Sequence, residues 1–252
     1  MAPDTQAGPF FGTFIEHWPT SLCALSMPHM GHALAHADAE RIASREDAVG
    51  PSDPRGFSPA LARWLAQALA RLPGDAFLRL GGRSFVTQER LPQPVCTVEQ
   101  ALELLAAPGE RAARMARRCL LSGRQVWLFV REWRPMQADE EFRLVMRQRT
   151  LIAASQLHHR LPFPQAHQRA PETADRITRL GHQLGAALHL PDVVADVWIP
   201  RDKAHKDELI ELNPLMAATG RALLETAVTG QHARALHLLK RDGTTLKFPL
   251  YQ

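Results

Sequence analysis

Two short apolar runs, 192–200 (DVVADVWIP) and 208–214 (ELIELNP), carry most of the information about the fold. Valine, isoleucine and leucine dominate both, which indicates two buried strands. Each run also holds polar side chains: Asp196 in the first, and Glu211 and Asn213 in the second. Because strand residues two apart share a face, Glu211 and Asn213 point to the same side. Carboxylate and amide oxygens suit Mg²⁺, so we expect a metal site here that water and nucleotide phosphates complete.

The composition is that of an ordinary soluble globular protein. The chain has 252 residues, of which 45% are hydrophobic and 22% are charged. No apolar run is long enough to span a bilayer, and the N-terminus lacks the pattern of a signal peptide. We therefore expect a cytoplasmic protein without a membrane partner.

Cysteine and histidine patterns do not point to a metal site of their own. Cys23, Cys96 and Cys119 are odd in number and widely spaced, so we expect small buried side chains rather than disulfides or zinc ligands. His29, His32 and His36 recur at helical spacing, which lets histidines chelate a metal. No cysteine or carboxylate completes that set, and we expect no metal role for it.

The net charge of +4 is modest, and most basic residues are arginines. Together with the abundant alanine, this bias is typical of a GC-rich bacterial genome. One predicted helix has a basic face, which we interpret as solvated surface, with a nucleic-acid patch as the alternative. The residues of this face are Arg111, Arg114, Arg117 and Arg118.

Hydrophobic periodicity and turn residues predict an α+β fold with mostly antiparallel strands. Ser58 is expected to cap a helix that begins at Pro59. Further helices are predicted at about 97–107, 110–121, 172–190 and 220–229. Strands are predicted at 77–80, 125–133, 140–148, 150–158, 193–199 and 208–212, with a last hairpin turned at Asp242-Gly243.

Six of these segments occur in the order of a known family. They are FLRLGGRS (77–84), LFVREW (128–133), EFR (141–143), LIAASQ (151–156), DVW (196–198) and LIELNP (209–214). In this order the chain resembles the cell division cycle 123 family of the ATP-grasp superfamily, from about residue 14 to residue 226. The resemblance implies a single ATP-grasp unit in which two α+β lobes, about 1–130 and 131–252, sandwich the nucleotide.

The resemblance also implies roles for basic and aromatic residues. Arg79 matches a lysine that contacts phosphates, and Arg143 matches an arginine that approaches them. Arg131, Glu132 and Trp133 match the hinge, where a backbone edge binds adenine and an apolar neighbour covers its face. Several structural alternatives stay open. Arg79 could lie on a surface strand, Trp133 could be plain core, and Arg143 could pair with Glu141, which shares its strand face.

ATP and Mg²⁺ are the cofactors that the resemblance implies. Asp196, Glu211 and Asn213 match the metal-binding positions, with ordinary strand-end polar residues as the alternative. One departure concerns the segment after Ser84. The family has a proline, a lysine and an aspartate there, whereas this chain has Phe85, Val86 and Thr87. The departure bears on catalysis more than on nucleotide binding.

Three functional classes remain open from the sequence. The first is an ATP-dependent carboxylate–amine ligase that acts through an acyl phosphate on an unknown carboxylate substrate. The second is a nucleotide-dependent assembly factor for a protein client, because eukaryotic members of the resembled family assemble translation initiation factor 2. The third is an ATP-using enzyme that acts on RNA, which the basic charge supports weakly. No Walker P-loop, GxSxG or GxGxxG motif occurs, so other nucleotide folds are not indicated.

Overall fold

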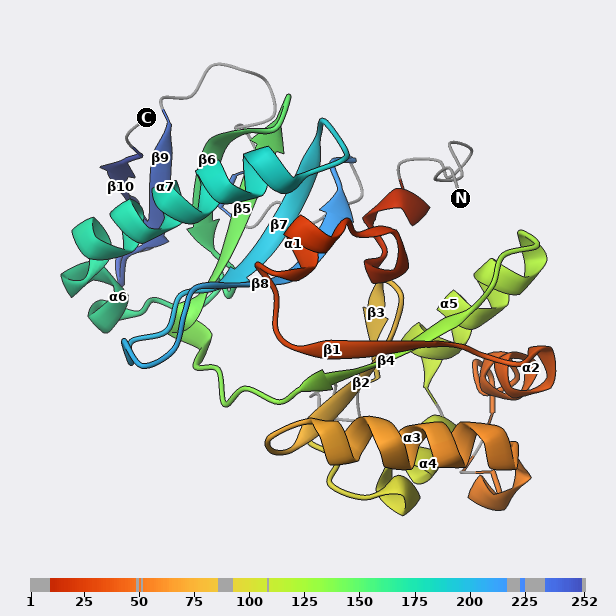
Figure 1. Ribbon diagram of the computed structural model, residues 1–252. Coiled ribbons are helices and arrows are strands. Elements are labelled where there is room, and N and C mark those ends of the chain that lie inside the picture. The colour runs from red at the N-terminus through yellow and green to blue at the C-terminus, as the bar shows by residue number, and fades with distance from the viewer. Residues whose placement is uncertain are drawn as a thin grey trace. The chain divides into compact units, whose positions relative to one another are not determined.

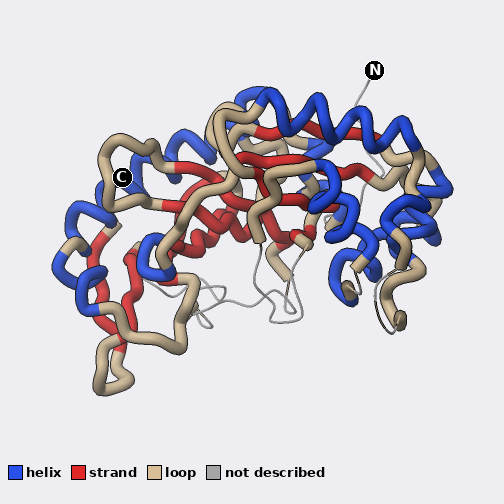
Figure 2. Tube along the Cα trace, turned by 90° about the horizontal axis from the view of Figure 1, so that it is seen from below, coloured by secondary structure: helices blue, strands red, loops and turns tan. Residues whose placement is uncertain are grey.

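The computed structural model describes residues 10–48, 50, 52–85, 93–107, 109–216, 223–224 and 234–250. The chain folds into two compact units. Unit 1 consists of Met1–Met27 together with Pro135–Gln252, and unit 2 consists of Pro28–Arg134. Each unit has its own sheet with helices packed beside the strands (Figures 1 and 2). No described helix has both the length and the hydropathy needed to cross a bilayer.

Unit 1 is built on a six-stranded sheet with the order β10-β9-β6-β5-β7-β8. All neighbouring pairs are antiparallel except β6 and β9, as the sequence largely predicts. The strands are β5 (Glu141–Arg147), β6 (Thr150–Gln156), β7 (Val193–Trp198), β8 (Glu208–Pro214), β9 (Ala235–Leu239) and β10 (Thr245–Pro249).

Helix α7 (Ala170–Ala187) packs on the strands of this sheet, with the closest approach at two glycines (Figure 1). A Cβ atom on Gly181 would lie 2.8 Å from the Leu151 side chain, and one on Gly185 would lie 2.3 Å from the Arg149 carbonyl oxygen. Only glycine therefore fits at Gly185, whereas a side chain at Gly181 would require Leu151 to shift. The smaller helical elements of unit 1 are η1 (Phe11–Thr13), η2 (Ile15–His17), α1 (Thr20–Cys23), η4 (Ala138–Glu140) and α6 (Pro164–Gln168).

The predicted hairpin of β5 and β6 is confirmed, and it turns through two residues with positive φ. Gln148 has φ 48° and Arg149 has φ 59°, as in the two-residue turns that match the twist of antiparallel strands. Neither residue is glycine, so the turn is strained unless its surroundings support it. Support comes from two hydrogen bonds, Gln148 N to Asp192 Oδ1 at 2.8 Å and Arg149 N to the Pro191 carbonyl at 2.7 Å.

Unit 2 contains a four-stranded antiparallel sheet with the order β1-β4-β2-β3. Its strands are β1 (His29–Ala33), β2 (Ala76–Leu80), β3 (Arg83–Ser84) and β4 (Trp127–Glu132). Its helical elements are α2 (His36–Ala43), η3 (Pro54–Gly56), α3 (Pro59–Arg71), α4 (Val98–Ala106) and α5 (Glu110–Leu121).

Helix α3 begins where the sequence predicts. The Ser58 hydroxyl accepts a hydrogen bond from Leu61 N at 3.2 Å, and Pro59 is the first helical residue. Leu61, Leu65 and Ala68 are buried at the i, i+4, i+7 spacing of one helix face. Burying each leucine stabilises the fold by about 1.5–3 kcal/mol, so this stripe fixes which side of α3 faces the interior.

Strand β1 is absent from the sequence-based prediction, which placed His29, His32 and His36 at helical spacing. The three histidines do not share a helix, because His29 and His32 lie in β1 and His36 begins α2. All five residues of β1 pair with β4, and Gly31 lies against Phe129, where a Cβ atom would come within 2.6 Å of the ring. His32 stacks on Trp64 with ring centroids 4.7 Å apart.

The three cysteines differ in their exposure to solvent. All three cysteines are free; Cys119 is buried as expected, Cys23 is half-buried, and Cys96 is exposed, contrary to expectation. The Cys96 thiol lies 3.1 Å from Asp75 Oδ1.

The helix predicted at 220–229 falls outside the described residues except for 223–224.

Candidate functional site

Three of the predicted site residues form one row across the sheet of unit 1. Arg143 of β5 is the direct cross-strand partner of Asp196 of β7, and Asp196 is the partner of Glu211 of β8. Residues directly opposite on antiparallel strands share a face, with Cβ atoms about 4.5–5.5 Å apart. A register irregularity follows Asp196, since Val197 pairs with Leu209 and leaves Ile210 as an extra residue. Such bulges are frequent beside functional sites because they redirect side chains.

Arg143 and Asp196 form a bidentate ion pair inside unit 1. Arg143 Nε lies 2.7 Å from Asp196 Oδ1, and Nη2 lies 2.7 Å from Oδ2. The two side chains are only 14% and 3% exposed. Burial raises the pKa of Asp196 to about 7, and the neighbouring Glu211 carboxylate adds to the rise, whereas Arg143 acts against it. Two carboxylates facing one arginine leave negative charge that a bound cation would neutralise.

Asn213 completes the predicted set. Its Nδ2 donates a hydrogen bond to Glu211 Oε1 at 2.8 Å and makes a longer contact of 3.5 Å with Asp196 Oδ2. The structure thus brings Asp196, Glu211 and Asn213 together on one face of two neighbouring strands.

This donor set fits Mg²⁺. It offers only hard oxygen ligands, which Mg²⁺ prefers over nitrogen or sulfur. Among the described residues, no group of three or more histidine, cysteine, aspartate or glutamate side chains could hold a metal. Mg²⁺ needs no such group, because it commonly uses one or two carboxylates and completes its shell with water and phosphate oxygens.

The row continues across the rest of the sheet, which the sequence did not reveal. Arg143 pairs with Ser155 of β6, Ser155 with His237 of β9, and His237 with Lys247 of β10. Ser155 and His237 are buried. The one available signal was Ser155, the only polar residue on its face of β6.

Glu141 does not take the role that the alternative gave it. It shares a strand face with Arg143, but its Oε1 lies 3.0 Å from His158 Nε2. This hydrogen bond raises the pKa of His158. Arg143 pairs instead with Asp196, which is 53 residues away in the sequence.

A second network, centred on the buried Glu140, supports the row from the adjoining ends of β5 and β7. Glu140 Oε2 accepts a hydrogen bond from Trp198 Nε1 at 2.9 Å. Its Oε1 accepts bonds from Arg201 N at 3.0 Å and from Arg201 Nε at 3.1 Å. Since Glu140 precedes β5 and Trp198 ends β7, the network ties the two strands that carry Arg143 and Asp196.

Arg79 lies in unit 2 and is buried, with 2% of its surface exposed. The alternative of a surface strand arginine is therefore wrong. Its Nε donates to the Gly81 carbonyl at 3.1 Å, and Nη1 donates to Ser84 Oγ at 3.1 Å. Gly81 has φ +39° at the tight turn that the sequence predicts after this strand. Contact between Arg79 and phosphates stays a prediction.

The three residues predicted to form a hinge, Arg131, Glu132 and Trp133, also belong to unit 2. Arg131 is fully buried, with its guanidinium 5.4 Å from the centre of the Phe77 ring. Trp133 is half-buried and meets Phe77 edge-on. Glu132 is buried and forms an ion pair with Arg134.

The backbone of the hinge is already engaged within unit 2. Glu132 N donates to the Pro28 carbonyl at 3.0 Å, and Trp133 N donates to the Asp75 carbonyl at 2.8 Å. Adenine recognition by this segment stays a prediction, and these two amides are used elsewhere in the fold.

Two further sequence features can be placed. Phe85 is buried, and its amide donates to the Leu78 carbonyl at 3.1 Å, whereas Val86 and Thr87 lie outside the described residues. On α5, Arg114 and Arg117 contact Glu46 at 3.0 and 3.4 Å, in keeping with a solvated basic surface.

Comparison with known proteins agrees with the resemblance in the sequence. The D123 family model matches residues 104–227. No curated protein matches the chain in sequence. Cdc123 from Schizosaccharomyces pombe is 19% identical, with a TM-score of 0.70 over 85% of this chain and 88% of that one.

Two other solved structures are similar. C-terminally truncated S. pombe Cdc123 is 18% identical, with a TM-score of 0.74 over 90% of this chain and 95% of that one. A RimK domain ATP-grasp protein from Sphaerobacter thermophilus is more distant, at 12% identity and a TM-score of 0.40 over 82% and 61% of the two chains. The two Cdc123 likenesses show the fold alone, and they confirm the α+β fold class expected from the sequence. The chain is thus similar to the D123 family over residues 104–227 and has the fold of Cdc123 over most of its length.

Proposed function

We propose that this protein binds ATP together with Mg²⁺, and that Asp196, Glu211 and Asn213 hold the metal. The cross-strand row of Arg143, Asp196 and Glu211, with Asn213 bonded to Glu211, carries the proposal. Bound Mg²⁺ would neutralise phosphate charge and orient the nucleotide. The likeness to Cdc123 supports the proposal at the level of fold.

In this proposal Arg143 orients Asp196 and also supplies positive charge beside the metal ligands. Its bidentate pair fixes the orientation of the Asp196 carboxylate, and the row places its positive charge on the same sheet face as the proposed ligands. Arg79, Arg131, Glu132 and Trp133 are proposed to contact the nucleotide, as the family resemblance implies. Arg79, Arg131 and Glu132 are buried in unit 2, and Trp133 is half-buried against Phe77, so each side chain has a defined position.

The reaction that we favour is ATP-dependent ligation of a carboxylate to an amine. A substrate carboxylate would attack the γ-phosphate and release ADP, and the amine would then displace phosphate from the acyl phosphate. Positioning and electrostatic stabilisation supply most of the rate enhancement in such phosphoryl transfers. Nothing on the sheet face of the row identifies the acceptor.

A nucleotide-dependent assembly factor for a protein client is the second candidate. The fold likeness to two Cdc123 structures over 85–90% of this chain favours it. The RNA-directed alternative has less support, because Glu46 partly neutralises the basic face of α5.

A thermal-shift titration tests the nucleotide proposal. MgATP should raise the melting temperature, because a ligand that binds only the folded state stabilises it. Glu211→Gln keeps the shape of the side chain and removes a carboxylate ligand, so we expect most of the Mg²⁺-dependent shift to vanish. Glu172→Gln removes an exposed carboxylate of the same unit that pairs with Lys203, and it should leave the shift intact.

The products then separate the functional classes. ADP released with a carboxylate substrate supports the ligase, AMP points to adenylylation, and binding without turnover favours the assembly factor. No shift at millimolar MgATP, or an equal shift in Glu211→Gln and wild type, would contradict the proposed site.

A further inference from the structure

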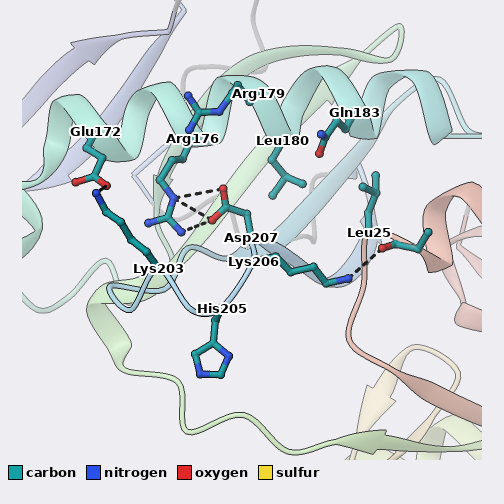
Figure 3. Close-up of a pocket in the computed structure, with 11 residues that line it drawn as sticks. Leu25, Glu172, Arg176, Arg179, Leu180, Gln183, Lys203, His205, Lys206 and Asp207 are labelled. Atoms are coloured by element: carbon teal, nitrogen blue, oxygen red, sulfur yellow. Dashed lines mark hydrogen bonds and ion pairs between the residues drawn. The ribbon is translucent and has the colours of Figure 1, made fainter.

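The loop that joins β7 to β8 is held to α7 by Arg176, whose side chain binds it at both ends (Figure 3). Nη1 of Arg176 donates to the Pro200 carbonyl at 2.7 Å, just after β7 ends. Nε donates to Asp207 Oδ1 at 3.0 Å, and Nη2 donates to the same oxygen, directly before β8 begins. We call Arg176, Pro200 and Asp207 the loop clamp, because one guanidinium binds the exit of β7 and the entry of β8.

The loop clamp is better shielded from water than the other ion pair between α7 and this loop. The side chains of Arg176 and Asp207 are 11% and 20% exposed. Glu172 and Lys203 pair at 3.2 Å, and their side chains are 48% and 81% exposed. Exposed ion pairs contribute little, whereas shielded charge-assisted hydrogen bonds are strong. Of the two ion pairs, that of Arg176 is therefore the one able to fix the loop.

The pairing of β7 with β8 connects the position of this loop to the proposed metal site. Beside the loop, Trp198 pairs with Glu208, whereas further along Asp196 pairs with Glu211, because Ile210 is an extra residue between the two registers. If regular pairing continued from Trp198 and Glu208, Ile210 would lie opposite Asp196. Both proposed ligands on β8 would then point to the opposite face of the sheet. The position of the ligands thus depends on the register beside the loop as well as on the bulge.

Other contacts hold the start of β8 to a different part of unit 1. Leu209 N donates to the Leu25 carbonyl at 2.7 Å, and the Leu209 carbonyl accepts from Ser26 Oγ at 2.9 Å. These bonds attach β8 to the N-terminal segment, whereas the loop clamp fixes β8 relative to the end of β7. Loss of the loop clamp should therefore loosen the register of the two strands without detaching β8 from the unit.

We infer that Arg176 is a positioning residue for the metal site, an inference that rests on the proposed function. Arg176 acts through the ends of β7 and β8 and does not itself bind the metal. By fixing the register beside the loop, it keeps the two proposed ligands of β8 on the face of Asp196. Contacts that orient metal ligands commonly change metal affinity by about 10–100-fold. The positive charge of Arg176 by itself repels a cation, so its electrostatic and positioning effects have opposite signs.

Titration of the full chain with Mn²⁺ tests the inference, because Mn²⁺ accepts the same oxygen ligands as Mg²⁺. Electron paramagnetic resonance measures the free ion, and broadening of amide signals at 195–197 and 210–213 locates the bound ion. Arg176→Met removes the guanidinium and keeps a long side chain. It should weaken Mn²⁺ binding about tenfold, whereas the loss of a positive charge alone would strengthen it.

A conservative variant tests whether the geometry of the guanidinium is the cause. Arg176→Lys keeps the charge, but an ammonium group lacks the planar fork that binds Pro200 and Asp207 together. Its affinity for Mn²⁺ should lie between those of wild type and Arg176→Met. If Arg176→Met does not fold, Arg176→Lys alone decides, and an affinity equal to that of wild type would contradict the positioning role.

Two control variants on α7 separate positioning from charge and from stability. Arg179→Met makes the same chemical change at an exposed position outside the loop clamp. Ile177→Val removes one buried methyl group, so it lowers stability and leaves the loop clamp in place. Both should bind Mn²⁺ as wild type does when all titrations are made below the melting temperatures.

The outcomes distinguish this inference from the proposed function. Weaker binding in Arg176→Met, with partial recovery in Arg176→Lys and none of the loss in the controls, supports the positioning role. Unchanged or tighter binding in Arg176→Met, or equal weakening in either control, would overturn it and leave the metal site standing. If wild-type protein shows no broadening at 195–197 and 210–213, the proposed metal site fails, and the role of Arg176 fails with it.

Discussion

Two arginines with little exposed surface, the half-buried Arg143 in unit 1 and the buried Arg79 in unit 2, are held in different ways. Arg143 pairs with a carboxylate 53 residues further along the chain. Arg79 donates to the Gly81 carbonyl and the Ser84 hydroxyl, two and five residues away. The pair of Arg143 needs β5 and β7 in the right register, whereas these two hydrogen bonds of Arg79 form within a tight turn.

The two arrangements should also differ in how much free energy is lost when a partner of the arginine is removed. Removing one partner of a buried ion pair leaves a charge without compensation, which costs about 3–5 kcal/mol. Removing a neutral acceptor costs about the free energy of one hydrogen bond. Removing a partner of Arg143 and removing a partner of Arg79 should therefore destabilise the protein by different amounts, and this difference can be measured.

The largest effect is expected for Asp196→Ala. The substitution removes both charge-assisted hydrogen bonds of the bidentate pair and leaves Glu211 as the carboxylate near Arg143, so the free energy of unfolding should fall by about 3 kcal/mol. Chemical denaturation measures the change. Asp175→Ala, an exposed aspartate on α7, serves as the control and should stay within about 0.5 kcal/mol of wild type.

Adding Arg143→Met to Asp196→Ala tests whether charge is the cause. Removing both charges should recover part of the loss. If the double variant is no more stable than Asp196→Ala, lost packing rather than an unpaired charge explains the effect.

An intermediate effect with a defined pH dependence is expected for Glu140→Gln. Burial by itself would raise the pKa of Glu140, but hydrogen bonds from Trp198, Arg201 and Gln137 hold it below its usual value. The resulting stability is present above the unfolded-state pKa of about 4.3 and is lost as the pH falls through the lower folded-state pKa. At pH 7 the substitution should cost about 1–3 kcal/mol.

Denaturation of Glu140→Gln and wild type at several pH values checks this expectation. The gap between the two proteins should narrow as the pH falls below about 4. A gap that stays constant from pH 7 to pH 3 would show that the charge of Glu140 contributes nothing.

The smallest effect is expected for Ser84→Ala in unit 2. Arg79 would lose the Ser84 hydroxyl and keep the Gly81 carbonyl, so the cost should be about 1 kcal/mol. Ser122→Ala at the exposed end of α5 is the matched control, with an expected change near zero. A loss for Ser84→Ala as large as that for Asp196→Ala would remove the distinction between the local and the long-range arrangement.

Local signals predicted much of the fold. The Ser58 cap, the Gly81 turn and the Asp242-Gly243 hairpin each depend on a few neighbouring residues, and all three are confirmed. Strand β1 was missed because the strand that it packs beside is distant in the sequence. Gly31 lies against the ring of Phe129, almost a hundred residues away. The Glu140 network was missed for the same reason, since Glu140 and Arg201 are 61 residues apart.

For the candidate site, the sequence by itself determined the residue types and the faces of their strands. Strand alternation already placed Glu211 and Asn213 on one side. Only the tertiary structure decided that Arg143 pairs with Asp196 rather than with Glu141, and that Ser155 and His237 extend the row. The physical reason is that alternation along a strand is a local property, whereas strand order and register depend on how the whole sheet packs.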